Sequence, residues 1–126
     1  MPLYGDELLT AVFANFRKDA KFKTTEGTLV SIFYELLQQP EYSSLAQEYP
    51  FDKDGIDPRS KALSDAFDSL QQSRLIGRLN PDLVVYSINE ALMLRYKKYI
   101  APKIGDQESL IKQLAQQVES KLPTAS

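Results

Sequence analysis

Residues 57–88 constrain the fold more than any other stretch, because a helical pattern leads directly into a hairpin pattern. Asp57 suits a helix N-cap, and Pro58 suits the first turn, where a fixed φ is favourable and no N–H is needed. An apolar stripe at helical spacing follows, made by Leu63, Ala66, Phe67 and Leu70. The turn signal Asn-Pro-Asp at 80–82 and the strand formers after it predict a β-hairpin over 76–88. A helix and a hairpin joined without a linker must share one core.

Further helical patterns lie on both sides of this stretch. The expected N-caps of these helices are Asp6, Thr24 or Thr25, Asn89 and Asp106. Pro40 and Pro102 interrupt the patterns that precede them. With 126 residues, 43% of them hydrophobic, the chain is long enough for one domain around one core. We therefore expect a single domain over 1–126 that is mainly α (α+β), with its core over about 24–88, and helical additions over 6–20 and 89–122.

The composition excludes several kinds of site. The chain has no cysteine and no histidine, which rules out disulfides, thiolate zinc sites, Cys/His nucleophilic pairs and Ser-His-Asp triads. It also has no run of about 18 apolar residues, and its first residues lack the basic start and apolar core of a signal peptide. These features predict a cytoplasmic protein without a membrane anchor. Asp and Glu pairs could in principle perform acid–base or metal chemistry, but no pair stands beside a glycine-rich phosphate loop, a ligand spacing or a nucleophile signature, so we expect no enzymatic activity.

The three aspartates at 52, 54 and 57 raise the question of a calcium loop. With Gly55 at the sixth position of an EF-hand loop, Pro50 falls at the first position and Lys61 at the twelfth, where a bidentate carboxylate is required. With Asp52 at the first position, Gly55 comes two residues early. Neither register fits, so we expect no metal, no cofactor and no small-molecule substrate.

The order of a helix, a short helix, a loop, a helix with an apolar stripe and a hairpin resembles the winged-helix superfamily over about 24–88. More narrowly, the residues Tyr49-Pro50-Phe51, Gly55, Ser60, Leu63, Leu70 and Leu75-Ile76 resemble the pattern of phage-associated, Panacea-type antitoxin domains. In those domains a loop with Gly-Pro and Ser precedes the helix, whereas this chain has Gly-Ile-Asp-Pro at 55–58 in place of a direct Gly-Pro. The resemblance implies a winged-helix fold and an antitoxin-like regulatory context, and it brings no catalytic residue.

One hypothesis is a DNA-binding transcriptional regulator. In such winged helices the exposed side of the helix before the hairpin enters the major groove, and the tip of the hairpin contacts the backbone or the minor groove. Side chains able to donate or accept hydrogen bonds here include Arg59, Lys61, Ser64, Gln71 and Arg78. Helix 58–74 with its Asp57 cap carries three cations and three aspartates, and the 76–88 hairpin adds one of each sign, so neither has the cationic excess that phosphate binding requires.

A variant of this hypothesis places DNA on two basic segments outside the expected core. Residues 17–23 hold four cations against one aspartate, and residues 95–103 include Arg95, Lys97 and Lys98. Basic residues near a helix C-terminus are also favoured by the helix dipole, which is the ordinary explanation for the first segment. DNA binding through these segments requires both to lie on one face, and the sequence does not decide this.

The other hypothesis is a protein-interaction or assembly module. Near-neutral recognition surfaces and seven tyrosines suit it, because interface cores favour aromatic residues over charged ones. From their patterns we expect Tyr34, Tyr86 and Tyr96 in the core. The tyrosines expected at the surface are Tyr42, Tyr49 and Tyr99.

The final helix carries an apolar stripe that must pack against something. Its 3-4 spacing suits either this domain's own core or a coiled-coil seam with a second copy of the chain. The residues that would form a homodimer seam are Leu110, Ile111, Leu114 and Val118. The partner is therefore another protein or a second copy, with DNA as the alternative.

Overall fold

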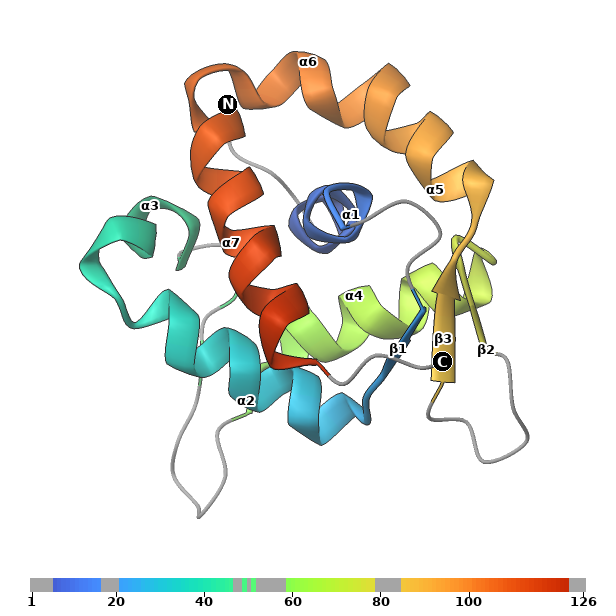
Figure 1. Ribbon diagram of the computed structural model, residues 1–126, viewed down its shortest axis with the longest axis horizontal. Coiled ribbons are helices and arrows are strands. Elements are labelled where there is room, and N and C mark those ends of the chain that lie inside the picture. The colour runs from blue at the N-terminus through green and yellow to red at the C-terminus, as the bar shows by residue number, and fades with distance from the viewer. Residues whose placement is uncertain are drawn as a thin grey trace.

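Helix α1 (Glu7–Ala14) lies at the centre of the molecule in the computed structural model, which describes residues 6–16, 21–46, 49, 51, 59–78 and 85–122. Figure 1 shows α1 end-on, with helices α4, α5, α6 and α7 around it. Every residue of α1 from Leu8 to Ala14 is buried. A helix expected as an addition to the core is therefore surrounded by the rest of the fold.

A small antiparallel sheet lies beside these helices. Its strands are β1 (Lys21–Lys23), β2 (Ile76–Arg78) and β3 (Val85–Ile88), in the order β1-β3-β2. The hairpin expected over 76–88 is confirmed, with Ile76 opposite Ile88. The connecting residues 79–84 lie outside the described residues. Together with the helices, this sheet confirms a mainly α fold of the α+β type.

Strand β1 is an element that the sequence pattern missed. We expected the first helix to reach about residue 20 and to end in a basic link, but it ends at Ala14. Phe22 explains the strand, because its ring stacks on Phe13 at 5.2 Å and on Tyr86 at 5.7 Å. One aromatic side chain thus ties the β1 edge of the sheet to the central helix, which a three-residue segment does not reveal by periodicity.

Helix α2 (Glu26–Leu37) begins where the sequence predicts. The Thr25 side chain accepts a hydrogen bond from the Thr28 N–H at 3.2 Å, as an N-cap does. Pro40 begins the 3₁₀ turn η1 (Pro40–Tyr42), which leads into the short helix α3 (Ser43–Ala46). This segment folds back over the core, and Tyr42 is fully buried.

Helix α4 (Lys61–Gln72) carries the expected apolar stripe, but its start was predicted too early. Ser60 is the N-cap, and its Oγ accepts a hydrogen bond from the Leu63 N–H at 3.2 Å. The extended backbone of Ser60 and its position three residues before this N–H make it the cap instead of Asp57. Residues 52–58, including the aspartate-rich loop, lie outside the described residues.

Helix α4 ends in a tight turn in which Arg74 has a φ of 60°. The Leu75 N–H reaches back to the Leu70 carbonyl at 2.9 Å, the long-range bond of a Schellman cap. Glycine usually occupies the left-handed position of such a cap, since a side chain there costs about 1–2 kcal/mol. The turn leads the chain directly into β2.

The next helical stretch is continuous although Pro102 was expected to interrupt it. It consists of α5 (Glu90–Arg95), the π-turn η2 (Tyr96–Ile100) and α6 (Ala101–Ile104), with Pro102 tolerated in the first turn of α6. The chain breaks instead at Gly105, which has a φ of 45°. Gly105 begins the 3₁₀ turn η3 (Gly105–Gln107), so Asp106 does not cap the final helix as expected.

The final helix, α7 (Glu108–Lys121), packs against α1 and α2 of its own chain. Ile111, Leu114 and Val118 are fully buried there, and Leu110 is partly buried against the same core. Of the two alternatives, intramolecular packing is therefore the one observed. Ile111, Leu114 and Val118 therefore have no exposed surface to offer a second copy, whereas Leu110 keeps part of its side chain at the surface.

Candidate interaction surfaces

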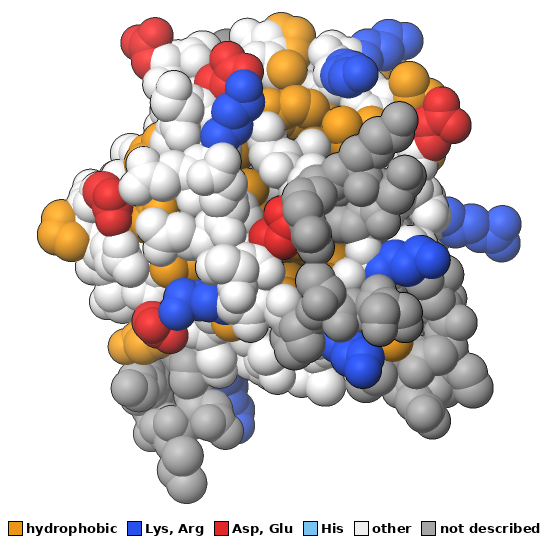
Figure 2. Space-filling view, in the orientation of Figure 1, with side chains coloured by type: hydrophobic (Ala, Val, Ile, Leu, Met, Phe, Trp, Pro, Cys, Tyr) orange, Lys and Arg blue, Asp and Glu red, His pale blue; other side chains and the backbone are white. Residues whose placement is uncertain are grey.

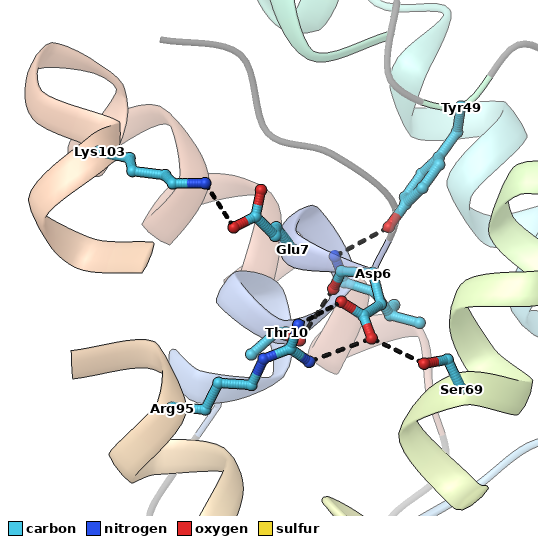
Figure 3. Close-up of polar contacts among 8 residues, drawn as sticks. Asp6, Glu7, Thr10, Tyr49, Ser69, Arg95 and Lys103 are labelled. Carbon is cyan, nitrogen blue, oxygen red and sulfur yellow. Dashed lines mark hydrogen bonds and ion pairs between the residues drawn. The ribbon is translucent and has the colours of Figure 1, made fainter. Parts of the chain in front are cut away.

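A polar cluster at the start of α1 ties this helix to its neighbours (Figure 3). Two nitrogens of the Arg95 guanidinium donate to the Asp6 carboxylate at 2.7 and 3.1 Å. The Ser69 hydroxyl donates to the same carboxylate at 2.8 Å. Such a bidentate pair is among the stronger hydrogen-bonded contacts of a protein. The pair joins α1 to α5, and the Ser69 hydrogen bond joins α1 to α4, both across a large separation in sequence.

Two further contacts complete this cluster. The Lys103 ammonium lies 2.7 Å from the Glu7 carboxylate, which links α6 to α1. The Leu9 N–H donates to the Tyr49 hydroxyl oxygen at 3.0 Å, so a buried side chain satisfies one of the N–H groups that a helix start leaves without an internal partner. With the contacts of Asp6, they connect the first turn of α1 to α4, α5, α6 and Tyr49 (Figure 3).

The charges in this cluster are fixed by their partners. Burial by itself raises the pKa of the Asp6 carboxyl, but hydrogen bonds from Arg95 and Ser69 and the Arg95 charge outweigh it, so the pKa lies below its ordinary value of 3.8. The hydrogen bond to Asp6 raises the pKa of Arg95 against its own burial. Both groups stay charged near neutral pH, and the cluster acts as a structural clamp.

Three residues therefore have positions that the sequence did not suggest. Arg95 was expected to point outward with Lys97 and Lys98, but it faces α1 and binds Asp6. Tyr42 and Tyr49 were expected at the surface, and both are fully buried. The sequence around Tyr42 and Tyr49 is polar and irregular, so it does not predict their burial, which depends on contacts with distant elements.

The outward side of α4 brings several expected site residues together without a cationic excess. Arg59 and Lys61 are exposed, but the Lys61 ammonium lies 3.3 Å from the Asp65 carboxylate one turn later. Asp68 is exposed on the same helix. Ser64 is half-buried, and the exposed charged side chains within α4 sum to −1.

An open groove of about 450 Å³ lies between the end of α4 and strand β2. Its lining consists of Gln71, Gln72, Arg74, Ile76, Gly77 and Asn89. The Asn89 side-chain amide donates to the Arg74 carbonyl at 2.6 Å and so holds the turn that shapes the groove. Gln71, which was expected at a contact surface, lines this groove and is half-buried. Arg78 was also expected at such a surface, but its side chain lies outside what the structure describes.

The outward side of α5 and η2 carries a second surface, which we define as the Leu94–Tyr99 face: Leu94, Lys97, Lys98 and Tyr99. Leu94 is 62% exposed and Tyr99 is 58% exposed, and among the described residues these two are the large hydrophobic side chains that are mostly exposed. Lys97 and Lys98 are exposed beside them, and the Lys98 ammonium lies 5.2 Å from the centre of the Tyr99 ring. In Figure 2, basic and hydrophobic side chains lie together over α5 and α6.

Sequence reasoning found part of this face. Lys97, Lys98 and the exposure of Tyr99 were expected and are confirmed, whereas Leu94 was missed. A leucine inside a helical apolar pattern gives no local sign that it faces solvent.

Comparison with known proteins leaves the family open. No protein-family model matches the sequence, and neither curated protein sequences nor solved structures gave a match.

Within the described ranges, no group of three or more acidic residues is placed to hold a metal ion. No helix in those ranges is both long and apolar enough to cross a membrane.

Proposed function

We propose that this chain is a non-enzymatic, winged-helix-type protein-interaction module that acts in the cytoplasm as an assembly or antitoxin-like regulatory subunit. The helix-then-hairpin arrangement of α4, β2 and β3 supports the winged-helix assignment. Strand β1 pairs with β3 and attaches this hairpin to the helices. The sequence has no cysteine and no histidine, so Cys/His nucleophilic pairs, Ser-His-Asp triads and thiolate metal sites do not contribute to its role.

The observation that carries the proposal is the charge of α4. In a DNA-reading winged helix this element would enter the major groove and need cations for the phosphates beside it. Here Lys61 is paired with Asp65, and the exposed Asp68 adds a further negative charge. With the exposed Arg59 and Arg74 at its two ends this surface is close to neutral, so it lacks the concentrated positive charge that phosphate binding requires and suits a protein partner.

One observation favours DNA binding as the second candidate. Lys21 and Lys23 point to solvent on the edge strand β1, and Lys97 and Lys98 are exposed on η2. Among the described residues of the two basic segments 17–23 and 95–103, these are the exposed cations, since Arg95 and Lys103 pair with Asp6 and Glu7. A DNA-binding mode would use them instead of α4.

Binding to mixed double-stranded DNA at about 50 and 200 mM salt distinguishes the candidates, because phosphate-based binding weakens steeply over this range. We expect no binding at either salt. We also expect a protein to copurify stoichiometrically from the native host after nuclease treatment. DNA binding that is strong at low salt and lost at high salt would overturn the proposal in favour of a regulator.

A further inference from the structure

We infer that the Leu94–Tyr99 face is a docking site for an acidic segment of a partner protein that also carries large apolar side chains. This inference rests on the proposed interaction function and names the surface and the chemistry of the partner.

The π-turn η2 explains how two apolar side chains come to share this surface. In a regular α-helix, residues five apart point about 140° away from each other. The Ala101 N–H bonds to the Tyr96 carbonyl, five residues earlier, and this wider turn brings Tyr99 nearer to the side of Leu94. Single π-turns of this kind occur frequently at functional sites.

The same turn keeps the opposite side of the helix packed on the core. The buried residues there recur every four positions: Leu92, Tyr96, Ile100 and Ile104. A regular helix advances by slightly more than one turn in four residues, so this row would drift away from α1. The π-turn corrects the drift, and it lets one continuous stretch bury one row while it exposes Leu94 and Tyr99.

The charge of this face is positive, because its four residues include two lysines and no acid; the exposed Glu90 lies one helical turn before Leu94. No acidic residue occurs between positions 91 and 105. Arg95 and Lys103 turn inward and are neutralised by Asp6 and Glu7. The two exposed lysines of the face therefore keep their charge toward solvent, and neither forms an ion pair with any described residue.

The exposure and the charge of the Leu94–Tyr99 face favour one kind of binding partner. Two cations are few compared with the roughly 6–10 phosphate contacts of a typical DNA-binding surface. A symmetric contact with a second copy would bring Lys97 and Lys98 toward the same lysines of that copy, which is unfavourable. An acidic segment with apolar side chains satisfies both parts of the face, since its carboxylates pair with the lysines while its apolar groups cover Leu94 and Tyr99.

The test uses the full chain and a synthetic peptide of about 15 residues. Its leucines recur every three to four residues with glutamates at neighbouring positions, so that both lie along one side of a helix. Backbone amide NMR shifts should change at the Leu94–Tyr99 face on titration. We expect Lys97→Glu with Lys98→Glu, and separately Leu94→Ser with Tyr99→Ser, to weaken binding by about tenfold or more. Because these side chains are exposed, the variants should keep the melting temperature of the parent chain.

Matched controls separate charge from position. Lys21→Glu with Lys23→Glu makes the same charge change on β1 and should leave peptide affinity unchanged. A peptide with glutamine in place of glutamate, and one with serine in place of leucine, should each bind more weakly than the parent peptide. Equal loss in the β1 variant, or shifts spread over other surfaces, would overturn the inference.

Other occupants give different results. Shifts at the same face with a short DNA duplex, stronger than with the peptide, would overturn the inference in favour of nucleic acid. A dimer mass that the Leu94→Ser and Tyr99→Ser change reduces to a monomer mass would identify a second copy instead. No peptide binding, with a native partner retained equally by parent chain and face variants, would refute this face while the proposed interaction function stands.

Discussion

The inward and outward sides of the α5–η2–α6 stretch use similar side chains in different ways. On the inward side Arg95 and Lys103 pair with Asp6 and Glu7 and fix the helix to α1. On the outward side Lys97 and Lys98 remain exposed beside Leu94 and Tyr99. The difference teaches that the basic character of this stretch serves two purposes, and that only half of it is available to a partner.

The largest difference in stability is expected between variants of two leucines in α5, one on each side of the helix. Leu92 is fully buried, so Leu92→Ala should lower the free energy of unfolding by about 2–5 kcal/mol. Leu94→Ala should change it by no more than about 0.5 kcal/mol. Urea denaturation followed by circular dichroism measures both. Similar losses for the two variants would mean that Leu94 is packed in solution and would end the distinction between the two sides.

A smaller loss is expected when the clamp at α1 is opened. Asp6→Ala removes the carboxylate that Arg95 and Ser69 contact, and leaves the Arg95 charge partly buried without its partner. We expect about 2–3 kcal/mol lower stability. The matched variant is Arg95→Ala, and a double-mutant cycle gives their coupling. If the double variant loses the sum of the two single losses, the pair contributes nothing and the inward side is not held by charge.

The clamp also predicts a pH dependence. The pKa of Asp6 is lower in the folded chain than its ordinary value, so its contribution to stability is present above the unfolded-state value of 3.8. That contribution should be lost as pH falls through the depressed folded-state pKa. Asp6→Asn should therefore differ from the parent chain at neutral pH, and the difference should shrink at strongly acidic pH. A difference independent of pH would assign the effect to shape instead of charge.

The smallest effect compares two lysines of the same stretch. Lys103 is paired with Glu7 at partly exposed positions, so Lys103→Met should lower stability by about 0.5–1 kcal/mol. Lys97→Met, which makes the same chemical change outward, should have no measurable effect. Thermal unfolding at low and high salt checks this, because only the Lys103 contribution should decrease with salt.

Much of the fold could be predicted from local patterns. The α4 stripe, the Thr25 cap, the hairpin and the mainly α class follow from side-chain period and backbone preference, which act over a few residues. Where the prediction failed, the cause was a distant partner. Phe22 forms a strand because Phe13 and Tyr86 stack on it, and no property of Lys-Phe-Lys reveals that.

The candidate surface was predictable only in part. Lys97 and Lys98 were identified as surface residues from their charge, but Arg95 was assigned to the same surface and is bound to Asp6. The separation of 89 residues between those two partners hides the pair from any local pattern. Leu94 was missed for a related reason, since helical spacing does not tell which side of a helix a π-turn will expose.

The sequence by itself determined the class of the fold, the absence of cysteine and histidine chemistry, and the buried stripes of the main helices, because composition and periodicity are local properties. The tertiary structure alone decided which basic residues of the α5–η2–α6 stretch pair with Asp6 and Glu7 and which are exposed. It also decided that α7 packs on its own chain, with Leu114 and Val118 fully buried. The physical reason is that charge pairing and burial depend on distances between elements, which the arrangement around α1 sets.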